Sequence, residues 1–176
     1  CISAVSRMDE DRSLASKQLI EITPKLYEKI PNLKVLVVGG GNDEENARSM
    51  AKTVNEKIGK EIVKLAGART DINKMVACGD MFVGVSRAAL EAMAEGKNTV
   101  IAGNEGFIGL FGEDKLDIGI KTNFCCRGCE KTTSVRLYSE IMRYYNMSDE
   151  EKRRLSEYSG EVVRKYYSVE KMTNDC

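Results

Sequence analysis

The sequence predicts an α/β domain: an open parallel sheet with helices on both faces, followed by C-terminal helices. Apolar runs of strand length alternate with helical patterns at short, regular intervals as far as residue 103. Glycine follows most of these runs, where a strand turns into the next helix. The last two segments, 132–147 and 148–167, show helical patterns only. We therefore expect one domain over residues 1–176, which is long enough to bury a core.

The elements follow one another in a simple order. Buried strands are expected at 2–5, 34–38, 61–66, 80–85 and 98–102. Helices are expected between them, marked by apolar positions 19, 22, 26 and 30, by positions 47, 50, 54 and 58, and by the segments 71–78 and 87–96. After Gly103 we expect a glycine-bearing loop at 104–109, a last short strand at 116–120 and an irregular segment at 123–130. Ser148 and Glu151 form a capping box at the start of the final helix.

Composition excludes several classes of function. Lys+Arg and Asp+Glu are equal at 27 each, so no net charge favours nucleic acid or anionic lipid. No apolar run has the length of a bilayer-spanning helix, and no signal peptide opens the chain. The absence of histidine excludes His-dependent triads and imidazole bases. Because the chain begins with Cys1 and an apolar strand, we expect a piece of a longer protein.

The six cysteines are unevenly spaced, which is not typical of a disulfide framework. We therefore expect reduced thiols and a cytoplasmic location. Three of them lie in FCCRGCE, as Cys125, Cys126 and Cys129. This spacing leaves two alternatives: a zinc site completed by Cys78, or a partly buried reduced loop, which adjacent cysteines favour because two neighbours rarely ligate one tetrahedral ion.

In a doubly wound sheet, ligands bind beyond the carboxyl ends of the strands. The segments that follow the five expected strands are 6–7, 39–41, 67–69, 84–87 and 103–106. Three of them contain arginine and four contain glycine, which suits a phosphate that approaches the backbone closely. In any single segment, a glycine is ordinarily a turn residue and an arginine is ordinarily a solvated surface residue, so one segment alone does not indicate a ligand. Their occurrence at consecutive strand ends favours a binding site.

The stretch VGVSRAALEAMAEG, residues 83–96, opens a helix directly after a strand. Such a helix directs its free N–H groups and its positive dipole end at a ligand above the sheet, and phosphate is the natural occupant. Glu91 lies further along this helix, at a distance suited to a ribose hydroxyl. The alternative is a buried crossover helix whose Glu91 faces solvent.

Four motifs carry a resemblance to a known family: SRMDEDRS, LKVLVVGGGND, DINKMVACGDMFVGVSRAALEAMAEGKNTVIAG and EVVRKYYSVEKM. In this order they resemble the C-terminal half of a family-4 (group 1) glycosyltransferase of the GT-B fold. The resemblance implies a Rossmann-like domain that binds a nucleoside-diphosphate sugar, most simply a UDP-sugar. It also implies a missing N-terminal domain that binds the acceptor, so that the present chain alone is inactive.

The resemblance assigns roles to individual residues. Arg7 and Arg12 are the catalytic candidates, because they fall where the family contacts the donor diphosphate; Arg12 replaces the usual lysine. Glu91 falls on the ribose-binding carboxylate. The substrate-binding candidates are Gly40, Ala68, Arg69, Ser86, Arg87, Leu90, Glu91, Glu105 and Gly106. Neither a metal nor another cofactor is expected, because the two arginines and the helix dipole can stabilise the leaving diphosphate.

One departure from the family concerns Val83, which stands where the family has a second carboxylate, eight residues before Glu91. Glu105 is the candidate to replace it in space. The departure also leaves a rival interpretation open, in which a degenerate glycosyltransferase-like domain senses a sugar nucleotide without turnover. An FMN-binding or protein-interaction domain of flavodoxin type is less favoured, because SRMDEDRS contains no glycine.

The resemblance also bears on partners and location. The expected acceptor is a cell-surface polysaccharide, a glycolipid or a small molecule, and no nucleic acid is expected. The protein is expected in the cytoplasm, at most peripheral on the inner face of the membrane. Six tyrosines lie in the last two helices. In the absence of the other domain they would leave an exposed apolar patch on the final helix, which would favour a homodimer.

Overall fold

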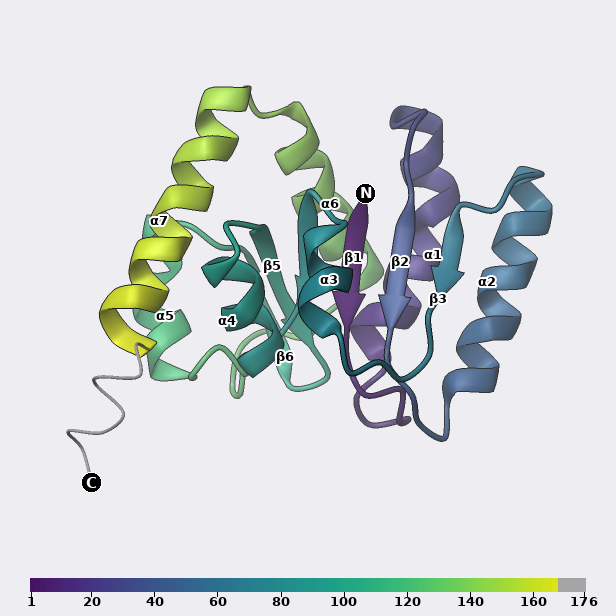
Figure 1. Cartoon of the computed structure of the whole chain (residues 1–176), viewed down its shortest axis with the longest axis horizontal. Coiled ribbons are helices and arrows are strands. Elements are labelled where there is room, and N and C mark those ends of the chain that lie inside the picture. Colours follow the sequence, from purple (N-terminus) through teal and green to yellow (C-terminus); the bar gives the residue numbers. More distant parts are fainter. Residues whose placement is uncertain (168–176) are drawn as a thin grey trace.

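A six-stranded sheet with the order β3-β2-β1-β4-β5-β6 forms the centre of the structure, a computed structural model that describes residues 1–167 (Figure 1). The strands are β1 (Ile2–Val5), β2 (Val35–Val38), β3 (Val63–Leu65), β4 (Met81–Gly84), β5 (Asn98–Gly103) and β6 (Gly106–Leu110). The helices are α1 (Leu14–Lys29), α2 (Glu44–Ile58), α3 (Ile72–Ala77), α4 (Ser86–Ala94), the 3-10 turn η1 (Glu113–Lys115), α5 (Leu116–Lys121), α6 (Ser134–Asn146) and α7 (Asp149–Tyr167). The end of EVVRKYYSVEKM, residues 168–172, and Cys176 lie outside the described residues.

The first five strands are parallel, as the sequence predicts. Ile2 of β1 pairs with Val35 of β2 on one side and with Met81 of β4 on the other. From β1 the chain therefore builds the sheet outward to β3, returns, and builds it outward again from β4. The gap between the carboxyl ends of β1 and β4 is the topological switch point, where doubly wound sheets bind ligands.

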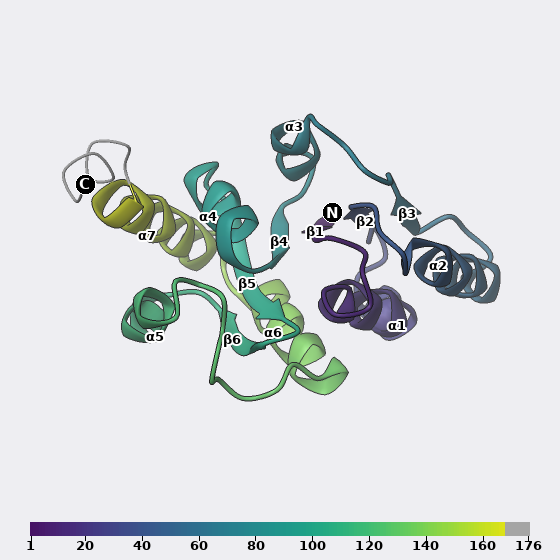
Figure 2. The same cartoon turned by 90° about the horizontal axis from the view of Figure 1, so that it is seen from below.

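Helices cover both faces of the sheet. Two clusters of buried side chains divide the core: one joins the sheet to α1, α2 and α6, and the other joins it to α3, α4 and α7. Figure 2 shows α1 and α6 on one side of the strands and α3 and α4 on the other. Every residue of β4 and β5 is buried, as expected for central strands enclosed on both faces. The rigid centre of the sheet thus carries the loops that follow β1, β4 and β5.

Two expectations for the segment after Gly103 are wrong. The expected loop at 104–109 contains β6, which pairs antiparallel with β5 and forms the edge of the sheet. The expected strand at 116–120 is the helix α5, in which Gly119 lies where an added Cβ would be 2.8 Å from the ring of Phe124. A five-residue apolar run has too few positions to distinguish a strand from one helical turn, and here packing against that ring decides.

The C-terminal helices confirm the capping box and correct the expected apolar patch. The Ser148 N–H donates to Glu151 Oε2 at 2.8 Å, and the Glu151 N–H donates to Ser148 Oγ at 3.2 Å. The α7 helix packs along α4, and the ring of Tyr158 stacks on Phe111 with centroids 6.0 Å apart. The aromatic side chains of α7 therefore pack against the core of this domain and do not form an exposed patch. Within residues 1–167, no helix is both long and apolar enough to cross a membrane.

Candidate functional site

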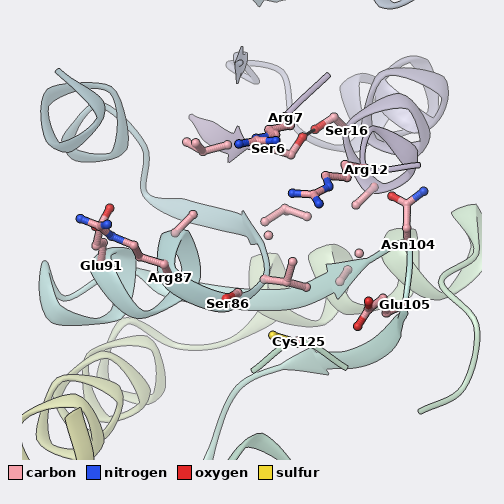
Figure 3. A pocket seen from close by; sticks show the side chains of 18 of the residues that line it. Ser6, Arg7, Arg12, Ser16, Ser86, Arg87, Glu91, Asn104, Glu105 and Cys125 are labelled. Atoms are coloured by element: carbon pink, nitrogen blue, oxygen red, sulfur yellow. Dashed lines mark hydrogen bonds and ion pairs between the residues drawn. The ribbon is translucent and has the colours of Figure 1, made fainter. Parts of the chain in front are cut away.

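A cavity of about 860 Å³ opens at the switch point between β1 and β4 (Figure 3). The loops that follow β1, β4 and β5 form its walls, together with the start of α4 and part of the cysteine-rich segment. The predicted residues that line it are Arg7, Arg12, Ser86, Arg87, Glu91 and Glu105. The chain thus brings together residues that are up to 98 positions apart, from Arg7 to Glu105.

The loop between β1 and α1 supplies two cations to one wall. Figure 3 shows Arg7 and Arg12 on the same side of the cavity, opposite Ser86. Arg12 lies 3.8 Å from the carboxylate of Asp11, a loose and exposed pair. Within residues 1–167, Arg7 forms no ion pair, so its guanidinium is available to an anion in the cavity. At the base of the loop the hydroxyls of Ser6 and Ser16 lie 2.9 Å apart.

The glycine turn after β2 holds this loop in place. Gly39 has φ +146°, and a Cβ there would lie 1.8 Å from the carbonyl oxygen of Ser6. At Gly41 an added Cβ would lie 2.4 Å from the backbone of Met8. The Met8 N–H also donates to the carbonyl of Gly40 at 3.1 Å. Glycine is therefore required here for the close approach of two backbone segments. The turn packs against Ser6 and Met8 and so fixes the start of the loop that carries the two arginines.

A buried ionic network anchors the same loop to α2. The carboxylate of Asp43 accepts hydrogen bonds from Ser13 Oγ at 2.6 Å and from Asn46 Nδ2 at 3.0 Å, and it pairs with Lys17 Nζ at 2.5 Å. The hydrogen bond from Lys17, followed by those from Ser13 and Asn46, lowers the pKa of Asp43 from 3.8 to about 2. Because Ser13 and Lys17 flank the start of α1, the network fixes the helix that follows the arginine loop.

The start of α4 lies on the opposite wall. Ser86 has a left-handed backbone with φ 54°, and its N–H donates to the carbonyl oxygen of Phe124 at 2.7 Å. The N–H groups of the next two residues have no acceptor within the helix, and the helix dipole adds positive potential there. One turn further, Arg87 Nε donates to Glu91 Oε1 at 2.8 Å. Arg87 is exposed and Glu91 is half-buried, so the pair remains open to solvent and a ligand can separate it at small cost.

The third wall follows β5. Asn104 Oδ1 accepts a hydrogen bond from the Leu14 N–H at 3.1 Å, which joins this wall to the start of α1. Glu105 accepts hydrogen bonds from Arg127 Nε at 3.1 Å and from Arg127 Nη2 at 3.2 Å. Figure 3 shows Glu105 and Asn104 at the end of the cavity away from Glu91. The cavity therefore has a carboxylate at each end, Glu91 and Glu105, and a third, Asp11, beside Arg12.

Five predicted binding residues do not line the cavity: Gly40, Ala68, Arg69, Leu90 and Gly106. Gly40 packs against Ala68, whose Cβ would lie 3.0 Å from an added Cβ at Gly40. The guanidinium of Arg69 is engaged by Asp71 through two bonds of 2.8 Å. Gly106 begins β6, and a Cβ there would lie 2.3 Å from the carbonyl of Cys126. A residue at the end of a strand reaches the cavity only if its side chain or backbone points into it. These five positions do not, and they contact other parts of the fold around the cavity.

Sequence reasoning missed several residues that line the cavity: Ser16, Thr70, Ile72, Asn73, Asn104, Cys125 and Arg127. Arg127 lies in FCCRGCE, which the sequence suggested only as a zinc ligand set or a reduced loop. Cys126 and Gly128, on either side of Arg127, both have left-handed backbones, which turn the chain back on itself. Nothing in the local pattern indicates that the segment returns to the cavity.

The cysteine side chains of this segment lie in different surroundings. Cys126 is fully buried, and burial raises the pKa of its thiol from 9.0 to about 12. Cys125 lines the cavity. In the part of the chain that the structure describes, no group of three or more His, Cys, Asp or Glu side chains is arranged to hold a metal ion. The geometry therefore gives no support to a zinc site and is consistent with a partly buried reduced loop.

The chain is similar to known glycosyltransferases in sequence pattern and in fold. The family model for glycosyl transferases group 1 matches residues 1–118. No curated protein sequence matches the chain. The C-terminal domain of the group 1 family protein LpcC from Francisella tularensis has a TM-score of 0.69 at 14% identity, covering 96% of this chain and 86% of that domain. At this identity the likeness concerns the fold.

Two longer glycosyltransferase structures are also similar. A TarM variant from S. aureus, in complex with fondaparinux, α-GlcNAc-glycerol and UDP, has a TM-score of 0.71 at 18% identity and covers 98% of this chain. HepE from Anabaena, in complex with UDP, has a TM-score of 0.66 at 19% identity and covers 99% of this chain. The present chain spans only 34% of the TarM chain and 46% of the HepE chain.

Proposed function

The chain belongs to the group 1 glycosyltransferases, and we propose that it forms the half of such an enzyme that binds a nucleoside-diphosphate sugar, with a UDP-sugar as the first candidate. The observation that carries this proposal is the arrangement of Arg7 and Arg12 opposite the start of α4, across a cavity at the switch point of the sheet. Two guanidinium groups and a helix N-terminus are together suited to a diphosphate. TarM and HepE, whose folds include this one, were both crystallised with UDP.

The donor has one natural orientation in this cavity. With the diphosphate between Ser86 and the two arginines, the ribose hydroxyls reach Glu91, one turn along α4. The base then lies toward α3, which packs against α4 and contributes Ile72 and Asn73 to the cavity. The sugar lies at the opposite end, beside Glu105. In this orientation α3, and not the 67–69 segment with the predicted binding residues Ala68 and Arg69, lies beside the base.

The proposed reaction transfers the sugar to an acceptor with retention at the anomeric carbon. As the bond between the sugar and the diphosphate breaks, negative charge grows on the departing diphosphate. Arg7, Arg12 and the dipole of α4 would stabilise that charge, so we propose a reaction that needs no metal. The acceptor would be bound by an N-terminal domain that is not part of this chain. We propose a cell-surface polysaccharide, a glycolipid or a small molecule as acceptor, and a cytoplasmic or peripheral inner-membrane location.

A second candidate is a binding module that senses a sugar nucleotide without transferring the sugar. Val83 favours it, because this buried β4 residue lines the cavity where the resembling family has a carboxylate. The two functions differ in turnover. The chain joined to its acceptor domain should release UDP from a UDP-sugar when an acceptor is supplied. Tight UDP binding with no release under any acceptor would instead favour the sensing module.

Binding is tested first, on the 176-residue chain itself. Calorimetric and thermal-shift titrations with UDP, GDP and ADP should identify one nucleotide that raises the stability. A ligand at 100 times its Kd adds about 2.7 kcal/mol to the free energy of unfolding. The double variant Arg7→Ala/Arg12→Ala should lose this effect, whereas Arg153→Ala, in an exposed pair on α7, should keep it. No binding by any of the three nucleotides would contradict the proposal.

A further inference from the structure

Two cysteines lie at the ends of a tight turn beside the cavity. Cys126 and Cys129 are separated by Arg127 and Gly128, which gives the C-x-x-C spacing of a redox dithiol. The Cys129 N–H donates to the Cys126 carbonyl at 3.0 Å and closes a four-residue turn. Gly128 has φ 80°, the value that the third residue of a type II turn requires. Such a turn keeps its end Cα atoms within about 7 Å, and a disulfide joins Cα atoms about 4.4–6.8 Å apart.

The two thiols share one apolar environment. Cys126 is fully buried, and Cys129 is partly buried against the same cluster of side chains. The pKa of the Cys126 thiol is raised to about 12, first by burial and then by the charge of Cys129, which acts more strongly than Cys125 or Glu105 does. The side chains of Cys126 and Cys129 therefore lie near each other, as the closed turn requires.

Contacts outside the turn hold its backbone in place. At Gly106, an added Cβ would collide with the Cys126 carbonyl oxygen and would lie 3.1 Å from Cys129 Cβ, so the turn lies directly on the start of β6. Just after the turn, the Glu130 carbonyl accepts a hydrogen bond from the Phe107 N–H at 2.8 Å. A disulfide tolerates only a narrow range of backbone positions. Because these positions are already fixed, only the two side chains need to rotate to join the sulfurs.

The same turn carries Arg127 into the wall of the cavity, where its guanidinium pairs with Glu105. The surrounding segment consists of turns and one isolated bridge, and Asn123, Phe124 and Cys126 in it have left-handed backbones. Such backbones are strained, so this segment opens more readily than the strands beside it. A covalent bond across the turn restricts the open states and holds Arg127 in the wall.

We propose that Cys126 and Cys129 form a redox modification site: they exchange with a low-molecular-weight disulfide to form a bond across the turn, which locks the cavity wall that carries Arg127. Cys129, which is partly exposed, attacks one sulfur of the external disulfide as a thiolate, and the first thiol leaves. Cys126 then loses its proton to solvent and attacks the Cys129 sulfur, and the second thiol leaves. The external disulfide takes up the two electrons and two protons that the cysteines lose. The inference is independent of the proposed function, since it requires no nucleotide.

Trypsin distinguishes the two states, because it cuts after Lys121, Arg127 and Lys131. The peptides 122–127 and 128–131 separate after digestion of the reduced chain and stay joined in the disulfide form. The 176-residue chain is incubated with mixtures of oxidised and reduced glutathione, its free thiols are alkylated, and the digest is analysed by mass spectrometry. The joined peptides should be the main product at an excess of oxidised glutathione, and an excess of reduced glutathione should separate them.

Single substitutions identify the sulfurs. Cys129→Ser, at a partly exposed position, and Cys126→Ala, which keeps a buried site apolar, should each abolish the joined peptides. Cys125→Ser and Cys78→Ser should keep them. Peptides that separate in the wild-type chain at every glutathione ratio would overturn the inference, and so would joined peptides that are lost in Cys125→Ser or kept in Cys129→Ser.

Hydrogen exchange measures the lock. The amides of residues 122–133 should exchange about tenfold more slowly in the disulfide form than in the reduced form, because the bond restricts local opening. The helix α2, which packs against α1 and β3, should exchange equally in both forms. Cys129→Ser treated with the same oxidised glutathione should keep the faster exchange of the reduced chain. Equal exchange of the segment in both forms of the wild-type chain would overturn the locking role of the bond.

Discussion

Ser86 and Phe124 are joined by a backbone hydrogen bond of 2.7 Å between two residues that both have left-handed backbones, with φ 54° and 55°. A positive φ is rare for serine and a genuine outlier for phenylalanine. The bond connects the start of α4, where the phosphate is proposed to lie, with the cysteine-rich segment. Phe124 is fully buried and packs edge-on against Phe111, with ring centroids 5.2 Å apart. Packing therefore holds the strained backbone in place.

Phe124→Ala should lower the free energy of unfolding by about 3–5 kcal/mol, the cost of emptying a buried aromatic site. Denaturant unfolding measures the change. Tyr145→Ala is the control: it removes an aromatic side chain that is 42% exposed, and it should cost about 0.5 kcal/mol or less. Equal effects of the two substitutions would show that the Phe124 ring does not hold the segment.

Arg7→Ala and Arg12→Ala should each reduce kcat/KM by an amount equivalent to about 2–4 kcal/mol, the scale of one lost charge-stabilising donor. The measurement requires the chain joined to its acceptor domain, with a UDP-sugar as donor. Turnover that is unchanged in both variants would rule out the assigned role of the arginine loop.

Glu91→Gln should weaken nucleotide binding by about 1–3 kcal/mol, because a carboxylate binds ribose hydroxyls more strongly than an amide does. Glu95→Gln is the matched control, since Glu95 is exposed at the end of the same helix and does not line the cavity. Calorimetry with the selected nucleotide compares the two. The ribose assignment fails if both variants bind equally well.

Asp43 should make the stability of the domain dependent on pH in the acid range. Its folded-state pKa of about 2 lies below the ordinary value of 3.8, so its contribution is complete above about pH 4 and is lost as the pH falls toward 2. Asp43→Asn should remove this part of the pH dependence, and it should cost about 3 kcal/mol at neutral pH because Lys17 loses its partner. Urea unfolding at several pH values checks both effects; a variant with the original acid profile would contradict them.

Gly39→Ala should destabilise the protein by about 3 kcal/mol or more, since the new Cβ would lie 1.8 Å from the Ser6 carbonyl oxygen and must displace the arginine loop. Gly59→Ala serves for comparison: Gly59 also has a positive φ, 77°, but open space around it, so only about 1 kcal/mol of backbone strain is expected. Nucleotide binding by the folded fraction of Gly39→Ala should also fall. Similar stabilities of the two variants would show that the close approach has no importance.

The sequence by itself determined the α/β class, the first five strands, the helices between them and the capping box of α7, because these depend on local periodicity and end signals. It also predicted that Arg7, Arg12, Ser86, Arg87, Glu91 and Glu105 lie together, and they line one cavity, since carboxyl ends of parallel strands converge at one edge of a sheet.

Only the tertiary structure decided which strand ends face the cavity. Arg69 does not line the cavity, because its guanidinium pairs with Asp71, whereas a segment without regular structure brings Arg127 to Glu105. The antiparallel β6 and the helix α5 likewise depend on contacts with β5 and Phe124 that are distant in sequence. The physical reason is that the direction of a side chain, and the return path of an irregular loop, are set by packing against residues that no local pattern contains.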